Sequence, residues 1–352
     1  MGKLKVGVIF GGKSTEHDVS IVSGTSVIKN LNKEKYEVFP IYIDENGEWY
    51  IYNKDVNKIE ILAVGEKITE LTQIDNPMQY LKNIEVVFPV LHGLYGEDGT
   101  IQGMLELLNK KYVGCKVLSS SICMDKVYAK VIFDKAQLQQ ADYIYIRPYK
   151  DEYIYVDKYF NEEICSVDKI CDVVEEKLKF PVFVKPSNSG SSVGINKSHN
   201  KKELAEHIKY ATQFDNKILI EQNINGREVE CAVLGNEEVI ASCVGEILPA
   251  EEFYTFDAKY KNAESRVVMP ADLPEEIAEK IRRNAIRAFK AVDGKGLSRV
   301  DFFVENGTNR IVINEINTLP GFTQISMYPK LWEQMGLSYC ELLDKLIELS
   351  ME

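Results

Sequence analysis

No stretch of this sequence approaches the roughly 20 consecutive apolar residues that a membrane-spanning helix needs. Its seven cysteines are scattered, and no two of them form a C-x-x-C pair, so we expect reduced thiols in a cytoplasmic protein. Its four histidines lack the paired spacing of a zinc site. The 42 basic residues are outnumbered by 54 acidic ones, and the net charge of −12 disfavours nucleic acid and anionic membranes as partners. The first residues lead directly into an apolar strand, so we expect no signal peptide.

The length of 352 residues, with 45% hydrophobic and 27% charged residues, predicts a soluble globular protein of two or three domains. Strands and helices alternate in its first third, which indicates a parallel sheet covered by helices. We expect strands near 3–10, 37–43 and 84–91, and helices between the first two strands and near 100–110. The turn at Gly11 and Gly12 lacks the G-x-G-x-x-G spacing, so a nicotinamide cofactor is not favoured.

The rest of the chain is typical of two further units, divided near 213–215. The first, 123–213, reads as a small α+β unit. The helix that follows Asp272 has one apolar face, with Asp272 expected as its N-cap and Gly294 beyond its end. The elements expected here are a helix near 123–140, strands near 180–185 and 217–221, the helix after Asp272, and a final helix near 331–350.

Two strands of the C-terminal unit end in polar side chains spaced two residues apart. Arg299 and Asp301 form one pair, and Glu315 and Asn317 form the other. Residues i and i+2 of a strand share a face, so Asp301, Glu315 and Asn317 are expected to converge in one pocket. Oxygen ligands of this kind suit Mg²⁺ bound with substrate phosphates. The alternative is that these are solvated residues at strand ends, which two coincident pairs disfavour.

A third pattern is a lysine that closes an apolar strand before a loop of small residues. Lys185 ends the strand near 180–185, and the loop 186–194 follows it. Such loops bring backbone N–H groups against phosphate oxygens, and a lysine adds a point charge. The alternative is a merely flexible connection. We favour phosphate binding.

These three elements, in this order, resemble the ATP-grasp superfamily, and their details are similar to the D-alanine–D-alanine ligase family. The resemblance covers nearly the whole chain, through the segments 6–20, 88–100, 123–126, 185–194, 221–228, 253–260, 299–301 and 311–323. It implies a three-domain ATP-grasp fold, α/β and α+β, with an N-terminal Rossmann-like parallel sheet. The implied domains are 1–122, 123–213 and 214–352.

The family resemblance implies that ATP phosphorylates the carboxylate of one D-alanine. The amine of a second D-alanine then attacks the acyl phosphate, giving D-alanyl-D-alanine for peptidoglycan precursors. Two Mg²⁺ ions, with Mn²⁺ as an alternative, and a homodimer are also implied. The other readings are a D-alanine–D-serine ligase, another ATP-grasp carboxylate–amine ligase, and a nucleotide-binding regulator without turnover, which would have no need of Glu16, Arg299 and a full metal set.

The resemblance also assigns roles to residues. Catalytic roles fall on Glu16, Ser191, Tyr260, Arg299 and Gly321. Substrate contacts fall on His92, Glu97, Ser326 and Met327. ATP contacts fall on Lys126, Lys185, Ser192, Glu221, Ile224, Glu228 and Lys259, and the metal ligands are Asp301, Glu315 and Asn317. Asp301→Asn is therefore expected to abolish turnover with little loss of folding.

Substrate choice is read from two places that resemble family motifs. The pair Lys259-Tyr260 is generally missing from members that use D-lactate, so lactate is not expected. Met327 stands where D-serine users often carry an arginine, which favours D-alanine as the acceptor. Thr255-Phe256 departs from the acid and tyrosine that relatives often place there, which leaves the shape of this loop open.

Overall fold

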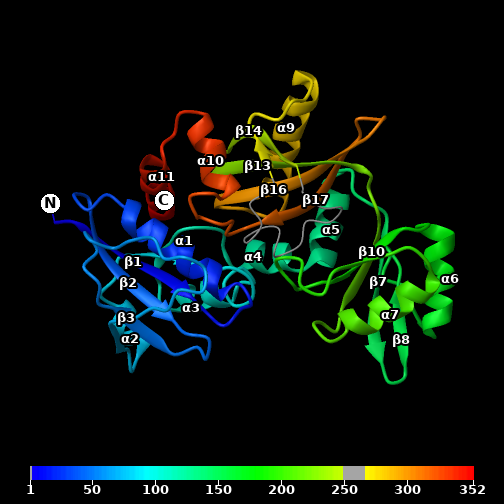
Figure 1. The fold of residues 1–352 in the computed structure, drawn as a ribbon, viewed down its shortest axis with the longest axis horizontal. Coiled ribbons are helices and arrows are strands. Elements are labelled where there is room, and N and C mark those ends of the chain that lie inside the picture. The colour runs from blue at the N-terminus through cyan, green and yellow to red at the C-terminus, as the bar shows by residue number, and fades with distance from the viewer. Residues whose placement is uncertain (1, 249–265) are drawn as a thin grey trace.

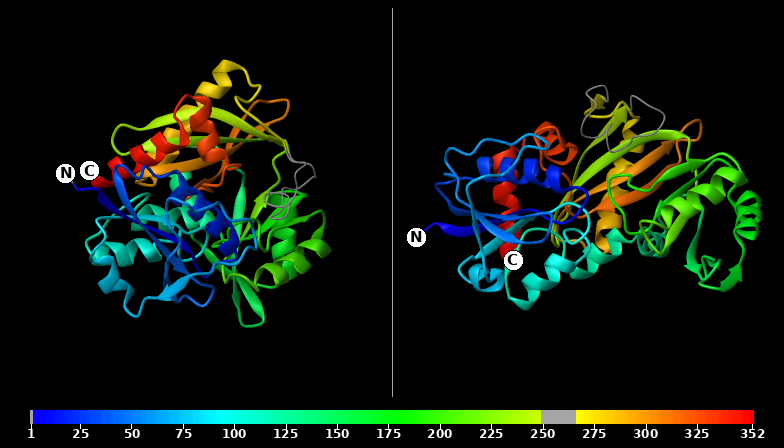
Figure 2. Two further views of the ribbon diagram at one scale, coloured as in Figure 1. Left: turned by 60° about the vertical axis from the view of Figure 1, so that its left-hand side comes forward. Right: turned by 60° about the horizontal axis from the view of Figure 1, so that its bottom comes forward.

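The computed structural model describes residues 2–248 and 266–352, which form three sheets. The N-terminal and central sheets lie at opposite ends of the molecule, and the C-terminal sheet lies between them (Figure 1). Two further views show the same separation (Figure 2). No helix among the described residues is long and apolar enough to cross a membrane. All seven cysteines are free, and five of them are buried.

The N-terminal sheet is parallel in its centre and antiparallel at one edge. Alternate residues of its central strand, such as Phe10 and Ile9, enter two different hydrophobic clusters, so both faces of the sheet are covered. The expected parallel sheet is thus confirmed for β2, β1, β5 and β6, whereas β3 and β4 run antiparallel. The elements are β1 (Leu4–Gly11), α1 (His17–Asn30), β2 (Tyr36–Ile43), β3 (Trp49–Tyr52), β4 (Leu71–Gln73), α2 (Pro77–Leu81), β5 (Val86–Val90), α3 (Thr100–Leu107) and β6 (Lys111–Tyr112).

The central sheet is antiparallel and carries two helices with buried apolar stripes. Its order is β11-β10-β12-β7-β8-β9, so β12 lies inside it, between β10 and β7. The break between the central and C-terminal sheets therefore falls after Gln222 rather than at 213–214, because β12 hydrogen-bonds to central strands. The elements are β7 (Tyr143–Tyr149), β8 (Glu152–Val156), β9 (Glu162–Cys165), α6 (Val167–Lys177), β10 (Val182–Pro186), β11 (Asn196–Ser198), α7 (Lys201–Ala211) and β12 (Ile218–Gln222).

The C-terminal sheet, in the order β15-β14-β13-β16-β17, is packed on both faces. One face buries α5 and α9, through side chains such as Phe133 and Phe289. The other face contacts α10, and α11 continues the same core toward the N-terminal sheet. The elements are α4 (Val117–Met124), α5 (Lys126–Lys135), β13 (Gly226–Gly235), β14 (Ile240–Leu248), β15 (Arg266–Val268), α9 (Glu275–Ala291), β16 (Gly296–Glu305), β17 (Ile311–Asn317), α10 (Met327–Gln334) and α11 (Tyr339–Met351).

Three expected helices differ from the structure at their ends. The helix expected at 123–140 is two helices, because Asp125 is extended (φ −86°, ψ 101°) and caps α5 with its side chain. The final helix is also two, since Ser338 and Glu341 form a capping box that starts α11. Pro274, not Asp272, occupies the N-cap position of α9.

Candidate active site

A cavity of about 780 Å³ is lined by residues of all three sheets' units. It gathers most of the side chains that the sequence nominated. Asp301 is an exception, because it is 3% exposed and is not part of the cavity wall. Lys259 and Tyr260 lie outside the described residues. The nominated residues that line the cavity are Glu16, His92, Glu97, Lys126, Lys185, Ser191, Ser192, Glu221, Ile224, Glu228, Arg299, Glu315, Asn317, Gly321, Ser326 and Met327.

The glycine loop of the central unit closes on the start of α1. The Ser191 hydroxyl donates a hydrogen bond to the carboxylate of Glu16, the residue directly before α1. Gly93 and Gly190 both pack against that carboxylate, since a Cβ at either position would lie 2.6 or 2.5 Å from Glu16 Oε2. Glycine is required for this close approach. The two expected partners, Glu16 and Ser191, are thus brought together.

His92 contacts backbone and a serine through both ring nitrogens. Its Nδ1 lies 3.0 Å from the carbonyl oxygen of Leu319, which can accept but not donate, so Nδ1 carries a proton. Its Nε2 lies 2.9 Å from Ser23 Oγ, which also accepts the Phe322 N–H at 3.2 Å. Burial lowers the pKa of His92, which favours a neutral ring that accepts the Ser23 hydroxyl proton. His92 therefore holds the segment that carries Gly321.

Glu97 holds the same segment from the other side. Its carboxylate accepts the Leu319 N–H at 3.2 Å and the Gly93 N–H at 2.8 Å. Burial, aided by the nearby Glu16 charge, raises the pKa of Glu97 to about 8. Although His92 and Glu97 line the cavity, the polar contacts made by His92 and Glu97 are to protein groups. Their expected contact with substrate stays a prediction.

Arg299 is the centre of an acidic cluster on the C-terminal sheet. Its guanidinium donates to both oxygens of Asp301, at 2.8 and 2.7 Å, and its Nε lies 3.0 Å from Glu230 on β13. Burial opposes the charge of Arg299, but Asp301 and Glu230 outweigh it and raise its pKa. The sequence analysis missed Glu230. The available signal was its position two residues after Glu228 on one strand face.

The strand register brings the expected metal ligands together. Asp301 pairs with Glu315, and Arg299 with Asn317, across β16 and β17. The Asn317 amide donates to Asp301 at 3.0 Å. Carboxylate and amide oxygens form a donor set that fits Mg²⁺, but an ion at Asp301 would compete with Arg299 for the same oxygens. Among the described residues, no group of three or more His, Cys, Asp or Glu side chains is arranged to hold a metal ion. Because Asp301 holds Arg299, the expectation that Asp301→Asn leaves folding intact is revised below.

Glu221 pairs with two lysines. One of its oxygens contacts Lys185, its neighbour on β10, and the other lies 2.9 Å from Lys130 Nζ on α5. Burial opposes the charged carboxylate, but Lys130 and then Lys185 outweigh it and lower the pKa of Glu221 to about 2. Lys130 is 3% exposed and was missed. It follows Lys126 by four residues, so the two share one helix face, which was the available signal.

The remaining nominated residues line two ends of the cavity. Lys126, the first residue of α5, donates to the Ser189 carbonyl oxygen at 2.5 Å and so reaches the glycine loop. At the other end, Ser326 Oγ lies 2.7 Å from Thr323 Oγ1 and accepts the Thr323 N–H at 3.0 Å. Met327 is 7% exposed and packs closely against the backbone of Gly245, which makes that wall apolar.

Comparisons with known proteins agree with this arrangement. The family described as "D-ala D-ala ligase N-terminus" matches residues 5–115, and "D-ala D-ala ligase C-terminus" matches residues 132–348. A D-alanine–D-alanine ligase of Acetivibrio thermocellus is 50% identical, over 99% of this chain and 96% of that protein. One of Clostridium acetobutylicum is 49% identical, over 99% of this chain and 98% of that protein.

Solved structures show the same similarity. The VanG D-Ala:D-Ser ligase of Enterococcus faecalis superposes with a TM-score of 0.84 at 36% identity, covering 99% of this chain and 100% of that one. The D-alanine–D-alanine ligase of Coxiella burnetii superposes with a TM-score of 0.81 at 34% identity, covering 100% of this chain and 94% of that one.

Proposed function

The chain belongs to the D-alanine–D-alanine ligase family, with its ATP-grasp fold, and we propose that it joins two D-alanine molecules at the expense of ATP. One observation supports this most directly. The Glu16–Ser191 pair and Arg299 come from three different units and line a single cavity. Such a cavity can hold two amino acids and a nucleotide phosphate together.

The first step requires an oxygen of one D-alanine carboxylate to attack the γ-phosphorus of ATP. A P–O bond forms, the bond to ADP breaks, and D-alanyl phosphate results. Lys126, Lys185 and the glycine loop are placed to bind the phosphates, and Glu16 is placed to bind the ammonium group of this D-alanine. Glu221 forms ion pairs with Lys130 and Lys185, so we assign it the support of the phosphate lysine in addition to the expected nucleotide contact.

In the second step the amine of another D-alanine attacks the acyl carbon. The C–N bond forms, a proton leaves the amine, and phosphate departs as the tetrahedral oxyanion collapses. Arg299 and the N–H of Gly321 are placed to stabilise that oxyanion. His92 and Glu97 hold Leu319, and this contact fixes the approach of Gly321.

The finer assignments rest on the donor groups and on the family. Asp301, Glu315 and Asn317 would hold Mg²⁺ ions, whose chemistry is to neutralise phosphate charge. Glu228, Ile224, Ser192 and Lys259 belong to the nucleotide end, and Ser326 and Met327 to the second substrate. We also propose a cytoplasmic homodimer that supplies peptidoglycan precursors.

A D-alanine–D-serine ligase is the second candidate, because the similar Enterococcus faecalis structure is titled as one. The apolar Met327 wall favours a methyl group over a hydroxymethyl group, and so favours D-alanine. The test is phosphate release from Mg-ATP with D-alanine, offering D-alanine, L-alanine, D-serine or D-lactate as the second substrate, with products identified by mass. D-Alanine-dependent release that yields D-alanyl-D-alanine is expected. No release with any of them would overturn the proposal, and a D-serine product formed faster would favour the second candidate.

A further inference from the structure

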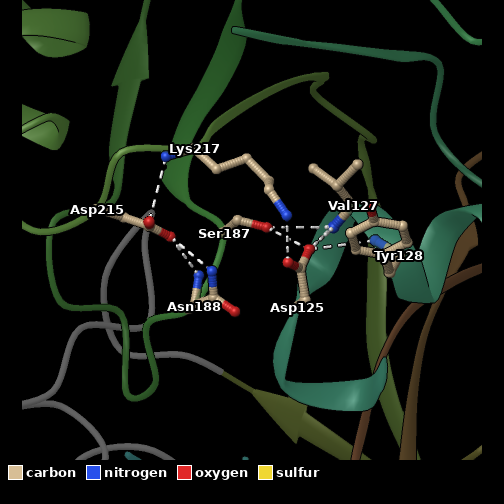
Figure 3. Close-up of polar contacts among 7 residues, drawn as sticks. All are labelled: Asp125, Val127, Tyr128, Ser187, Asn188, Asp215 and Lys217. Carbon is tan, nitrogen blue, oxygen red and sulfur yellow. Dashed lines mark hydrogen bonds and ion pairs between the residues drawn. The ribbon is translucent and has the colours of Figure 1, made fainter. Parts of the chain in front are cut away.

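A polar cluster centred on Asp125 joins α5 to the glycine loop (Figure 3). One carboxylate oxygen of Asp125 accepts the Val127 and Tyr128 N–H groups, at 3.0 and 3.2 Å, and the Ser187 hydroxyl, at 2.7 Å. The other oxygen pairs with the Lys217 ammonium group. None of these residues lines the cavity. The cluster therefore lies behind the site rather than in it.

Asp125 lies where two units of the fold meet. The apolar face of α5, with Ala129 and Phe133, belongs to the core beneath the C-terminal sheet. Ser187 and Lys217 belong to the central unit, at the end of β10 and the start of β12. Ser187 also accepts the Lys126 N–H at its carbonyl oxygen, at 3.1 Å. One buried carboxylate thus ties the helix that carries Lys126 to the loop that follows Lys185.

The same cluster fastens the first residues of the loop. Asp215 accepts the backbone and side-chain N–H groups of Asn188 on one oxygen, at 2.7 and 3.0 Å. Its other oxygen accepts the Lys217 N–H at 3.2 Å. Figure 3 shows both carboxylates facing the loop from opposite sides of Ser187 and Asn188. The loop thus enters the cavity from an anchored base.

We propose that Asp125 is a positioning residue for the nucleotide phosphates. Through Ser187 and Lys217 it holds the glycine loop and Lys126 at a fixed separation, so both can contact one phosphate chain. This inference rests on the proposed ATP-dependent function. It predicts that loss of Asp125 affects the nucleotide selectively, because Glu16 and Arg299 are positioned by other contacts.

The test compares steady-state kinetics of Asp125→Ala, Asp125→Asn and Lys217→Met. Because misplacement of a binding group by about 1 Å can cost about a hundredfold, we expect Asp125→Ala to raise KM for ATP about ten- to a hundredfold. KM for D-alanine should stay near the wild-type value. Asparagine caps helices about as well as aspartate, so Asp125→Asn keeps the cap and loses only the ion pair. It should match Lys217→Met, with a smaller rise in KM for ATP.

A matched control separates positioning from simple loss of a helix cap. Asn200 caps α7 in the same central unit, accepting the Glu203 N–H at 3.0 Å, and is not part of the cavity wall. Asn200→Ala should lower the melting temperature and leave KM for ATP unchanged. If Asp125→Ala does not fold, Asp125→Asn and Lys217→Met carry the test. Wild-type KM for ATP in both of these would overturn the proposal.

Calorimetric titration of ATP, without D-alanine, keeps the two proposals apart. Weakened ATP binding in the Asp125 and Lys217 variants supports the positioning role even if the wild-type protein forms no dipeptide, an outcome that would refute the ligase function alone. Unchanged ATP binding in variants of an active ligase refutes the positioning role alone.

Discussion

Glu221→Gln should destabilise the central unit strongly, because it leaves Lys130 and Lys185 facing each other without their shared carboxylate. The side chains of Lys130, Glu221 and Lys185 are 3%, 7% and 12% exposed, so water screens them poorly. Removing one partner of a buried ion pair costs roughly 3–5 kcal/mol. The lowered pKa of Glu221, from 4.5 to about 2, corresponds to about 3 kcal/mol. Both values give a loss of about 3 kcal/mol or more.

This loss should depend on pH in a definite direction. Because folding lowers the pKa of Glu221, its contribution is complete above the unfolded value of 4.5 and is lost as the pH falls toward about 2. Wild type and variant should therefore differ most near neutral pH, and less in acid.

The assay must report on the central unit. The chain has two tryptophans, Trp49 and Trp332, and both lie outside that unit, so their fluorescence is a poor probe. Urea titrations followed by circular dichroism near neutral pH and in acid, with amide hydrogen exchange of β10 and β12, would measure the loss. Glu162→Gln is the matched control, because its ion pair with Arg147 is exposed (53% and 39%). Exposed pairs contribute about 1 kcal/mol or less. Equal losses for the two variants, or a loss independent of pH, would refute the reasoning.

Three other predictions follow from the site. Asp301→Asn should abolish turnover, as expected from the sequence, but should also lower the free energy of unfolding by about 1.5–3 kcal/mol, because Arg299 loses a charged partner; phosphate release at the wild-type rate would contradict the metal assignment. Because folding raises the pKa of Glu97 to about 8, the wild type should lose stability as pH rises from 4.5 to about 8, and Glu97→Gln should lose less. Parallel curves of melting temperature against pH would rule this out. Tyr260→Phe should loosen control of the second nucleophile with the fold intact, and an unchanged dipeptide yield and pH profile would show that the assignment is wrong.

Local patterns in the sequence were sufficient for the strands that carry the site. The period of two along a strand places Arg299 and Asp301 on one face, and the structure has β16 there. Lys185 does lie near the end of β10, next to the loop. These features depend on neighbouring residues only, so they can be read from a single chain.

Element ends were read less well where a side chain far away decides them. The apolar pattern runs through 123–140 without a break, yet Asp125 ends one helix and caps the next. Its extended backbone is stabilised by Ser187 and Lys217, which come from strands more than sixty positions along the chain. Similarly, β12 joins the central sheet because its hydrogen-bond partners lie there.

The sequence alone indicated which residues carry the chemistry, since the family's motifs are short and local. Tertiary structure decided which of them touch. It placed Glu230 against Arg299, Lys130 against Glu221, and His92 against the Leu319 backbone. The physical reason is that the register between distant strands, and the docking of helices onto them, follow from burial of the whole core and not from any local period.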